Sequence, residues 1–294
     1  MNDAGHPREL WWNYTSENQK MGDDDLRFLR DLPTEDMESF GLDHVAVTDD
    51  GMANLPAMPK LTKLEVSGPR LTTACLRTLY RFPRLEYLAL PGLRSANAGD
   101  FAALGQLKEL EFLNFEGADI NDDAVPTLVA LPRLQTLLLD WAYDGSRGPK
   151  LTPAAIAQLG ECQSLECLRL SGCAVDDATL TVLARKLPQL TELFIAKTQI
   201  TDASIDSLKK LEHLEWLSIS ETRVTDAGIA ALAGHPSIKT LSLDGTRVGD
   251  AAFATFATMP KLREIWANRV QFSDGAVANF KKQHPNVRVE FTGR

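Results

Sequence analysis

The feature that most constrains the fold of this chain is a repeat, clearest in residues 190–236. The two halves of this segment read LTELFIAKTQITDASIDSLKKLEH and LEWLSISETRVTDAGIAALAGHP. Laid over one another, they keep apolar residues in the same columns, as Leu193 over Leu217 and Ile205 over Ile229. A fixed period of about 20 to 50 residues is typical of solenoids, in which each unit packs only on its neighbours. The repeat therefore predicts one elongated domain.

The unit L-x-x-L-x-L recurs along most of the chain at intervals of 24 or 25 residues, with one interval of 31. Three of its columns are apolar throughout. The first column is Met37, Leu61, Leu85, Leu110, Leu134, Leu165, Leu190, Leu214, Ile238 and Leu262; the fourth is Phe40, Leu64, Leu88, Leu113, Leu137, Leu168, Leu193, Leu217, Leu241 and Ile265; the sixth is Leu42, Val66, Leu90, Phe115, Leu139, Leu170, Ile195, Ile219, Leu243 and Ala267. Alternation over L-x-L predicts a short strand, and the apolar stripe that follows predicts a helix. Strand and helix alternating in this way predict a parallel sheet with helices outside it.

Acidic residues recur where each helix is predicted to start. A carboxylate there caps backbone amides and interacts favourably with the helix dipole. Paired acids such as Asp176 and Asp177 occupy the same place, so capping explains them better than calcium binding or acid–base catalysis does. The predicted helix N-caps are Asp202, Asp226, Asp250 and Asp274.

The strand pattern resembles the leucine-rich repeat family, whose signature is L-x-x-L-x-L-x-x-N/C-x-L. The later half, T-x-[IV]-[TG]-D-x-x-[ILF]-x-x-L, resembles the bacterial class with repeats of roughly 24 residues and, more distantly, the ribonuclease-inhibitor-like class. The resemblance implies an α/β solenoid of about ten repeats, a horseshoe or arc with a parallel concave sheet and convex helices. Thr hydroxyls are able to bond the backbone groups that the signature Asn would bond. The residues that replace Asn are Thr198, Thr222, Thr246, Cys173 and Ala118.

A solenoid needs a cap at each end, because a terminal repeat exposes its core. Residues 1–36 are predicted to form the first cap, with a helix that starts at the acids 23–25. Alternating residues 287–291 predict a final strand that closes the sheet, so the leucine-rich repeat domain is predicted to span 37–291. Three rings are available to cover the core at the first end: Trp11, Trp12 and Tyr14.

A net charge of -9 and a pI near 5.1 argue against binding to nucleic acids or anionic membranes, which attract basic protein surfaces and repel acidic ones. A basic partner is favoured instead. No apolar run approaches the roughly 18 residues that cross a bilayer, and residues 1–20 lack the features of a signal peptide. We therefore expect a cytoplasmic monomer. Four cysteines are too few and too unevenly spaced for a disulfide framework or a zinc site, which predicts buried free thiols: Cys75, Cys162, Cys167 and Cys173.

The sequence offers little for catalysis. Its five histidines are scattered, and no Gly-rich phosphate loop, nucleophile elbow or H-E-x-x-H occurs. Residues 32–40, LPTEDMESF, resemble the opening of an F-box, as in ubiquitin-ligase adaptors, but Met37 and Phe40 fall on the repeat columns. We therefore predict no catalytic residue, no cofactor and no metal site.

Binding is predicted for the concave face, to which the residues between the core leucines point. Large rings occur there although packing does not require them, and Trp, Tyr and Arg dominate interface hot spots. Mutual coverage of neighbouring rings on the sheet is the alternative explanation. One predicted cluster is Tyr87, Phe112, Leu138 and Trp141, and the other is Phe194, Trp216 and Arg169 with Trp266 two repeats further on. Charged residues complete the predicted partner-binding set: Glu192, Lys197, Glu221 and Asp244.

The interval of 31 residues places about seven extra residues in the segment 140–150, DWAYDGSRGPK. Its Gly, Pro and charged residues predict a loop at one edge of the arc, beside the first cluster. Insertions in repeat proteins often lie on the binding face. Trp141, Tyr143 and Arg147 are therefore predicted partner contacts, although a neutral insertion fits the sequence equally well.

The predicted function is that of a non-enzymatic scaffold that binds a protein or peptide through an aromatic and acidic concave face. Carbohydrate recognition is a second hypothesis, since flat rings flanked by carboxylates also stack on sugars. A third is an enzyme or an effector-type or substrate-recognition adaptor, for which the sequence supplies no nucleophile and no second domain.

Overall fold

The computed structural model describes residues 6–13, 21–95, 98–142 and 145–292. Contacts divide the chain into two compact units, residues 1–151 and 152–294. The boundary follows directly after the predicted insertion at 140–150. Each unit is described by itself.

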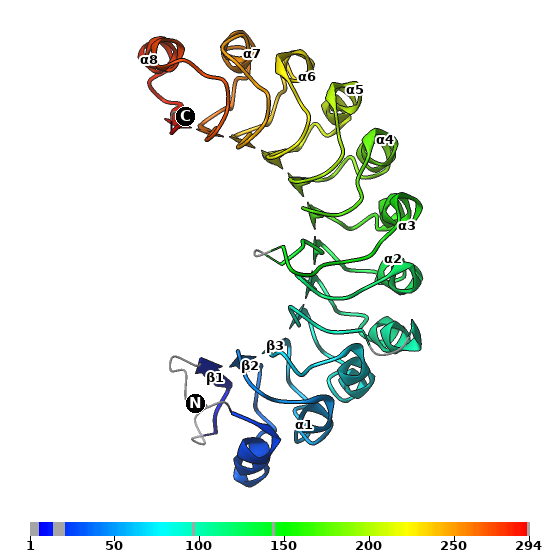
Figure 1. Cartoon of the computed structure of the whole chain (residues 1–294). Coiled ribbons are helices and arrows are strands. Elements are labelled where there is room, and N and C mark those ends of the chain that lie inside the picture. The colour runs from blue at the N-terminus through cyan, green and yellow to red at the C-terminus, as the bar shows by residue number, and fades with distance from the viewer. Residues whose placement is uncertain (1–5, 14–20, 96–97, 143–144, 293–294) are drawn as a thin grey trace. The chain divides into compact units, whose positions relative to one another are not determined.

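In the first unit, short strands form a parallel sheet in which neighbours in the chain are neighbours in the sheet. Short helices cover one side of this sheet (Figure 1). The strands in the described residues are β1 (Glu9–Asn13), β2 (Ser39–Asp43), β3 (Lys63–Val66), β4 (Tyr87–Ala89), β5 (Phe112–Asn114) and β6 (Thr136–Leu138). The helices are η1 (Asp23–Asp31), α1 (Asp49–Ala53), η2 (Thr73–Arg81), η3 (Ala98–Gln106), η4 (Asp122–Ala124) and α2 (Val125–Val129), where η denotes a 3-10 helix.

The second unit repeats this plan, with parallel strands on one side and helices on the other (Figure 1). Its strands are β7 (Cys167–Arg169), β8 (Glu192–Phe194), β9 (Trp216–Ser218), β10 (Thr240–Ser242), β11 (Glu264–Trp266) and β12 (Arg288–Glu290). Its helices are α3 (Pro153–Gln158), η5 (Leu159–Glu161), α4 (Asp177–Lys186), α5 (Asp202–Ile205), η6 (Asp206–Lys210), α6 (Asp226–Ala230), α7 (Ala252–Phe256) and α8 (Asp274–Gln283). The predicted α/β leucine-rich repeat solenoid is confirmed.

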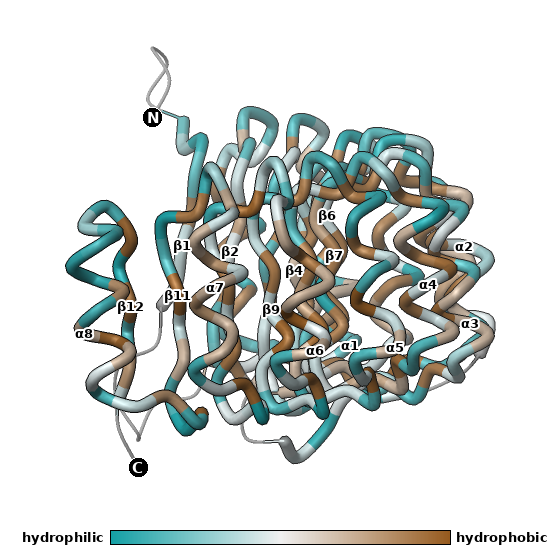
Figure 2. The backbone as a smooth tube through the Cα atoms, turned by 90° about the horizontal axis from the view of Figure 1, so that it is seen from above, coloured by the Kyte–Doolittle hydropathy of each residue, from teal (hydrophilic) through white to brown (hydrophobic). Residues whose placement is uncertain are grey.

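The three apolar columns form the core, as predicted. Every residue of the first, fourth and sixth columns is at most 1% exposed. Figure 2 shows the hydrophobic segments recurring at the strands, while the turns between strands and helices are largely hydrophilic. Each repeat therefore buries its apolar side chains between its own strand and helix and against the neighbouring repeats.

Several of the predicted helices are 3-10 rather than α-helical. The helix of the second repeat, η2, is a 3-10 helix throughout, and α5 continues as η6. A 3-10 helix rises about 2.0 Å per residue against about 1.5 Å in an α-helix. Fewer residues then span the same length, which suits a repeat that must return to the sheet within about 24 residues.

Three of the four aspartates predicted as helix N-caps bond across repeats instead. The Asp202 carboxylate accepts hydrogen bonds of 2.7 and 2.6 Å from the backbone N–H and hydroxyl of Thr225, one repeat later. Thr225 is itself the N-cap of α6. Asp226 and Asp250 make the same inter-repeat contact, to Gly249 and Ser273. The N-cap prediction was wrong for Asp202 and Asp226 because each carboxylate lies one position beyond the cap, and Asp274 likewise follows its cap, Ser273. Asp250 lies one position before the N-cap of α7, which is Ala251.

The threonines that replace the signature asparagine do bond to the backbone, as predicted. Thr198, Thr222 and Thr246 each donate a 2.7 Å hydrogen bond to the carbonyl three residues earlier. These bonds satisfy buried carbonyls within each repeat's own turn. The link to the next repeat is made by backbone bonds, such as that from Lys197 N–H to the Ser220 carbonyl.

Both predicted end elements are present, with one addition at the first end. The helix expected after the acids 23–25 is η1, and β12 lies within the predicted final strand and pairs with β11. The strand β1 was not predicted, and it pairs with β2. Trp11 and Trp12, on β1, are exposed rather than buried over the core. Tyr14 lies outside the described residues.

Titration of three side chains predicts that acid destabilises the fold. Burial lowers the pKa of His235 below its usual 6.5, so the unfolded chain binds this proton first and stability falls as pH drops below about 6.5. Hydrogen bonds from Thr179 lower the pKa of the Asp176 carboxyl. At Asp177, burial raises the pKa of the carboxyl, but hydrogen bonds from Ser204 and Thr201 outweigh burial, so this pKa is lowered too. The stability that these two carboxylates contribute is present above pH 3.8 and is lost as the pH falls through their pKa values in the folded protein.

We therefore expect the free energy of unfolding in urea to decrease between about pH 7 and pH 5, before the carboxylates titrate. The variant His235→Gln should flatten this part of the profile and leave the later loss near pH 3 to 4 in place. An unchanged slope between pH 7 and pH 5 in the variant would assign it to another group.

Candidate functional site

The side of each sheet that carries no helices is called here the sheet face of that unit. Side chains of the third and fifth repeat columns lie on it, because they alternate with the buried fourth column along each strand. This placement confirms the predicted orientation of the columns. The residues on the sheet faces are therefore those that core packing leaves free to vary.

In the first unit, Tyr87 and Phe112 lie side by side on β4 and β5. Their rings stack with centroids 4.1 Å apart and planes 5° from parallel. The Lys63 ammonium, on β3, lies 4.4 Å from the centre of the Tyr87 ring. Burial raises the pKa of the Tyr87 hydroxyl, and the nearby Glu65 carboxylate raises it further. The predicted pairing of Tyr87 and Phe112 is present.

The ring of Trp11 joins this group from β1, a residue that the sequence prediction assigned only to the end cap. It lies 4.7 Å from the Lys63 ammonium. Its ring occupies the space above Gly41, where a Cβ atom would come within 2.1 Å of it. The glycine at position 41 was the one feature of the sequence that pointed to this contact of Trp11. It can be interpreted only once β1 is known to pair with β2.

The other members predicted for the first cluster lie apart from the stacked rings. Leu138 is only 9% exposed and belongs more to the core than to the surface. Trp141 packs on Gly148 of the inserted segment, where a Cβ would lie 2.4 Å from its ring. Among the described residues no aromatic ring stacks on Trp141, so the structure does not join it to Tyr87. Tyr143 lies outside the described residues.

In the second unit, the predicted neighbours Arg169, Phe194 and Trp216 are in contact. The rings of Phe194 and Trp216 have centroids 5.0 Å apart, and the Arg169 guanidinium lies 4.9 Å from the Phe194 ring. Trp216 is 40% exposed. Trp266 is also exposed but contacts Arg288, at 5.9 Å, rather than Trp216. Beside this cluster, Glu192 accepts a 3.4 Å hydrogen bond from the Cys167 thiol.

Burial was predicted for all four cysteines, but only three are buried: Cys75, Cys162 and Cys173. Burial raises the pKa of the Cys162 thiol to about 12. Cys167 differs because it occupies the third column and lies half-buried on the sheet face of the second unit. A nucleophilic cysteine requires a lowered pKa, so the Cys162 thiol is not poised as a nucleophile.

The predicted charges Lys197 and Glu221 belong to a row just beyond the strand ends of the second unit. The Glu221 carboxylate lies 4.0 Å from the Lys197 ammonium and 3.1 Å from the guanidinium of Arg269, which the predicted set lacked. Arg269 reaches across Gly245, whose missing side chain leaves the space open. Asp244 accepts a 2.6 Å hydrogen bond from the backbone N–H of Asn268, so its carboxylate is used in the turn.

This row has a left-handed backbone, with φ of 56° at Lys197, 54° at Glu221 and 58° at Arg269. Other repeats place glycine in the same column, with positive φ at Gly172 and Gly245. A side chain in this conformation costs about 1 to 2 kcal/mol per residue. An exposed ion pair stabilises the folded state by only about 0 to 1 kcal/mol.

Replacing Lys197 and Glu221 together by Gly is therefore expected to raise the free energy of unfolding, by about 1 kcal/mol after the lost ion pairs are counted. Urea denaturation measures this change. The pair Lys197→Ala and Glu221→Ala is the matched control, since it removes the same charges but keeps the strained Cβ atoms. Equal stability of the Gly and Ala variants would contradict the account of strain.

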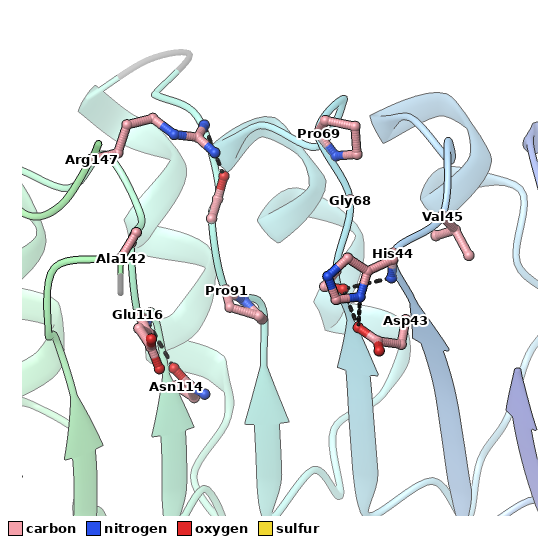
Figure 3. A pocket seen from close by; sticks show the side chains of 13 residues that line it. Asp43, His44, Val45, Gly68, Pro69, Pro91, Asn114, Glu116, Ala142 and Arg147 are labelled. Atoms are coloured by element: carbon pink, nitrogen blue, oxygen red, sulfur yellow. Dashed lines mark hydrogen bonds and ion pairs between the residues drawn. The ribbon is translucent and has the colours of Figure 1, made fainter. Parts of the chain in front are cut away.

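A pocket of about 820 Å³ lies beyond the strand ends of the first unit (Figure 3). It is lined by successive turns that follow β2 to β5 and by the inserted segment. Small and rigid residues such as Pro69, Pro91 and Gly117 leave the space open. Arg147, predicted as a contact of the insertion, lies here and directs its guanidinium to the Gly92 carbonyl at 3.5 Å (Figure 3). The sequence prediction missed this pocket.

Polar groups lie at both ends of the pocket. The Asp43 carboxylate is 2.7 Å from a ring nitrogen of His44 and accepts a 2.6 Å bond from the Ser67 hydroxyl. Burial opposes ionisation of Asp43, but these two hydrogen bonds outweigh it and lower the pKa of the carboxyl. At the other end, the Asn114 side chain accepts a bond from the backbone N–H of Glu116 (Figure 3). The pocket thus combines apolar walls with charged ends.

No group of three or more His, Cys, Asp or Glu side chains in the described ranges is placed to hold a metal ion. Within the same residues, no helix is both long and apolar enough to span a lipid bilayer.

Comparison with known proteins agrees with the fold. A family model described as Leucine Rich repeat matches residues 161–184, one repeat of the second unit. The crystal structure of an internalin (inlF) from Listeria monocytogenes is similar with a TM-score of 0.59 and 17% sequence identity, over 88% of this chain and 82% of that one. That of an internalin C2 (inlC2) from the same organism has a TM-score of 0.48 and 22% identity, over 67% of this chain and 84% of that one. The buried columns, the repeated strand and helix, and the family match over residues 161–184 show that this chain has a leucine-rich repeat fold.

Proposed function

We propose that this protein is a non-enzymatic scaffold that binds a protein or peptide through its sheet faces. The observation that carries the proposal is the exposed ring of Trp216 beside Phe194 and Arg169. The same column of the neighbouring strands holds Glu192 and Thr240, so the fold accepts a small or polar residue at this position. An exposed ring that packing does not need is typical of an interface anchor.

The charge of the surface favours a basic partner. The chain carries a net charge of -9, and acids such as Glu65, Glu192 and Glu264 lie half-buried among the rings of the sheet faces. Opposite charges speed the encounter of two proteins and select the right orientation. Salt should therefore slow association with the natural partner.

The pocket beside Arg147 gives the inserted segment a role in the same proposal. Its volume of about 820 Å³ lies within the range of pockets that bind small ligands, so it has room for a side chain of a partner. Arg147 and Asp43 offer charges of opposite sign at its rim. We infer that a loop of the partner enters this pocket while its flat surface covers the sheet face of the first unit.

The experiment is affinity capture from a lysate of the cells that produce the protein, followed by direct binding of the purified candidate. Three baits are compared: the natural chain, the pair Phe194→Ala and Trp216→Ala, and Tyr80→Ala. Tyr80 is a matched control because it is 61% exposed but belongs to the helix η2. The proposal requires a partner that is lost with the first variant and retained with the second.

Carbohydrate recognition is separated from protein binding by the same baits. If sugars are the ligands, a glycan array should bind the natural chain and lose the signal when Trp216 is replaced. No array signal together with a captured protein supports the scaffold. Array binding without a protein partner would replace the proposal by the carbohydrate hypothesis.

A further inference from the structure

The ammonium group of Lys63 lies between two aromatic rings in the first unit. Its Nζ atom is 4.7 Å from the centre of the Trp11 ring and 4.4 Å from that of Tyr87. Both distances fall inside the roughly 6 Å at which a cation is attracted to a ring face. Among the described residues no carboxylate forms an ion pair with Lys63, so these two rings are the partners that hold its charge.

The rings are held in place by the sheet. Tyr87 stacks on Phe112, which fixes the plane of its ring. Trp11 lies over Gly41, and the Cβ that any other residue would carry there would come within 2.1 Å of the indole. The strand pairing brings β1, β2, β3 and β4 into adjacent positions, so the two rings flank the column that carries Lys63.

A carboxylate adds to the attraction for a cation. Glu65 lies on the same face as Lys63, two residues along β3, and is close enough to Tyr87 to raise the pKa of its hydroxyl. Its strand neighbours are Gly41 and Ala89, which have little or no side chain to cover it. Two ring faces thus flank the ammonium, and one carboxylate lies on the same face of the strand two residues further along.

We propose that Trp11 and Tyr87 form a binding site for a lysine-type ammonium group of the partner, and that Lys63 fills this site while the protein is free. The inference rests on the proposed function, since it names the chemistry that one sheet face recognises. An internal lysine that makes the contacts of the ligand shows that the site accepts an ammonium group. It also competes with the ligand, so the partner must displace it.

Competition makes a measurable prediction. A site that is mostly occupied by an internal group binds an external ligand more weakly, by the fraction of molecules in which the site is open. Removing the charge of Lys63 should therefore strengthen binding of a small cation. The energy of two exposed cation–ring contacts corresponds to a change of about tenfold in the dissociation constant of the cation.

The probe is tetramethylammonium chloride, with 3,3-dimethylbutan-1-ol as a neutral compound of similar size. Binding to the full chain is followed by tryptophan fluorescence and by calorimetry at constant ionic strength. In the variant Lys63→Met the dissociation constant for tetramethylammonium should be about tenfold lower than in the natural chain, and the neutral compound should show no such gain. The gain should disappear in the double variant Lys63→Met and Trp11→Leu.

Controls keep the outcome specific to this site. Trp266→Leu in the Lys63→Met background removes another exposed ring and should leave the gain intact. Lys63→Gln serves as a second neutral variant, and thermal unfolding verifies that each variant is folded. The proposal is overturned if neither neutral variant binds tetramethylammonium more tightly than the natural chain, or if the gain survives loss of Trp11.

Failure here is distinguishable from failure of the proposed function. The capture experiment depends on Phe194 and Trp216 in the second unit, whereas the tetramethylammonium titration reports on Trp11 and Tyr87 and needs no partner. A negative titration with a positive capture would leave the scaffold in place and remove only the ammonium site.

Discussion

The variant Trp216→Ala is expected to bind the partner at least about 30-fold more weakly than the natural chain. Truncation of a central interface tryptophan typically costs about 2 kcal/mol or more, and 1.4 kcal/mol corresponds to tenfold in affinity. Trp216 fits this role because its ring is 40% exposed and lies against Phe194. Calorimetry or surface binding with the purified partner measures the loss, which should fall mainly on the dissociation rate.

The same variant should leave stability almost unchanged. Leu217 and the other core residues of β9 keep their contacts, because the Trp216 side chain lies on the opposite face of the strand. The urea midpoint should move by little, while Tyr80→Ala should alter neither binding nor stability beyond a small surface effect. Equal affinity of the Trp216 and Tyr80 variants would remove the sheet face of the second unit from the interface.

The second large effect is expected for stability, at Asp202. Its carboxylate accepts two hydrogen bonds from Thr225 of the next repeat, and the variant Asp202→Ala leaves both donors without this partner. Hydrogen bonds to a charged group contribute about 1.5 to 3 kcal/mol. We expect Asp202→Ala to lower the free energy of unfolding in urea by about 2 to 3 kcal/mol, near neutral pH.

Gly228 provides a test of this contact from the other side. A Cβ at Gly228 would lie 2.4 Å from a carboxylate oxygen of Asp202, so Gly228→Ala should also destabilise the chain. Because the clash is with the Asp202 side chain, part of the cost should vanish in the double variant, with a coupling of about 1 kcal/mol. Gly275→Ala is the matched control: a Cβ there meets no atom within 4 Å, and the change should stabilise by about 0.5 kcal/mol. Additive costs at Asp202 and Gly228 would contradict the account.

Much of the fold could be predicted because its signal is local and repeated. An alternating L-x-L segment has one side to bury, and ten copies at nearly constant spacing leave one arrangement in which all of them are covered. The contact of Phe194 with Trp216 followed from the same register, since it places the two rings diagonally across the adjacent strands β8 and β9. Trp141 shows the limit of this reasoning, because the inserted segment breaks the register and turns the ring toward Gly148.

The aspartates illustrate why a correct residue pattern still gave an incorrect contact. A carboxylate beside Thr225 at a helix start fits both a cap and a bond to the next repeat, and the two differ by one position. Only the distance between adjacent repeats decides between them. The pocket near Arg147 and the left-handed turn at Glu221 were missed for a similar reason, because both depend on the backbone path of several turns and not on one motif.

By itself, the sequence determined the repeating unit, its buried columns and the set of side chains that lie on the sheet face, because these follow from alternation and spacing within each repeat. The tertiary structure alone decided which of those side chains meet. Trp11 reaches Lys63 because β1 adds to the sheet beside the bare Gly41, and Arg269 reaches Glu221 because Gly245 between them has no side chain. Both contacts require a side chain to cross a neighbouring strand or repeat. The distance that the side chain must cross is set only when the repeats stack.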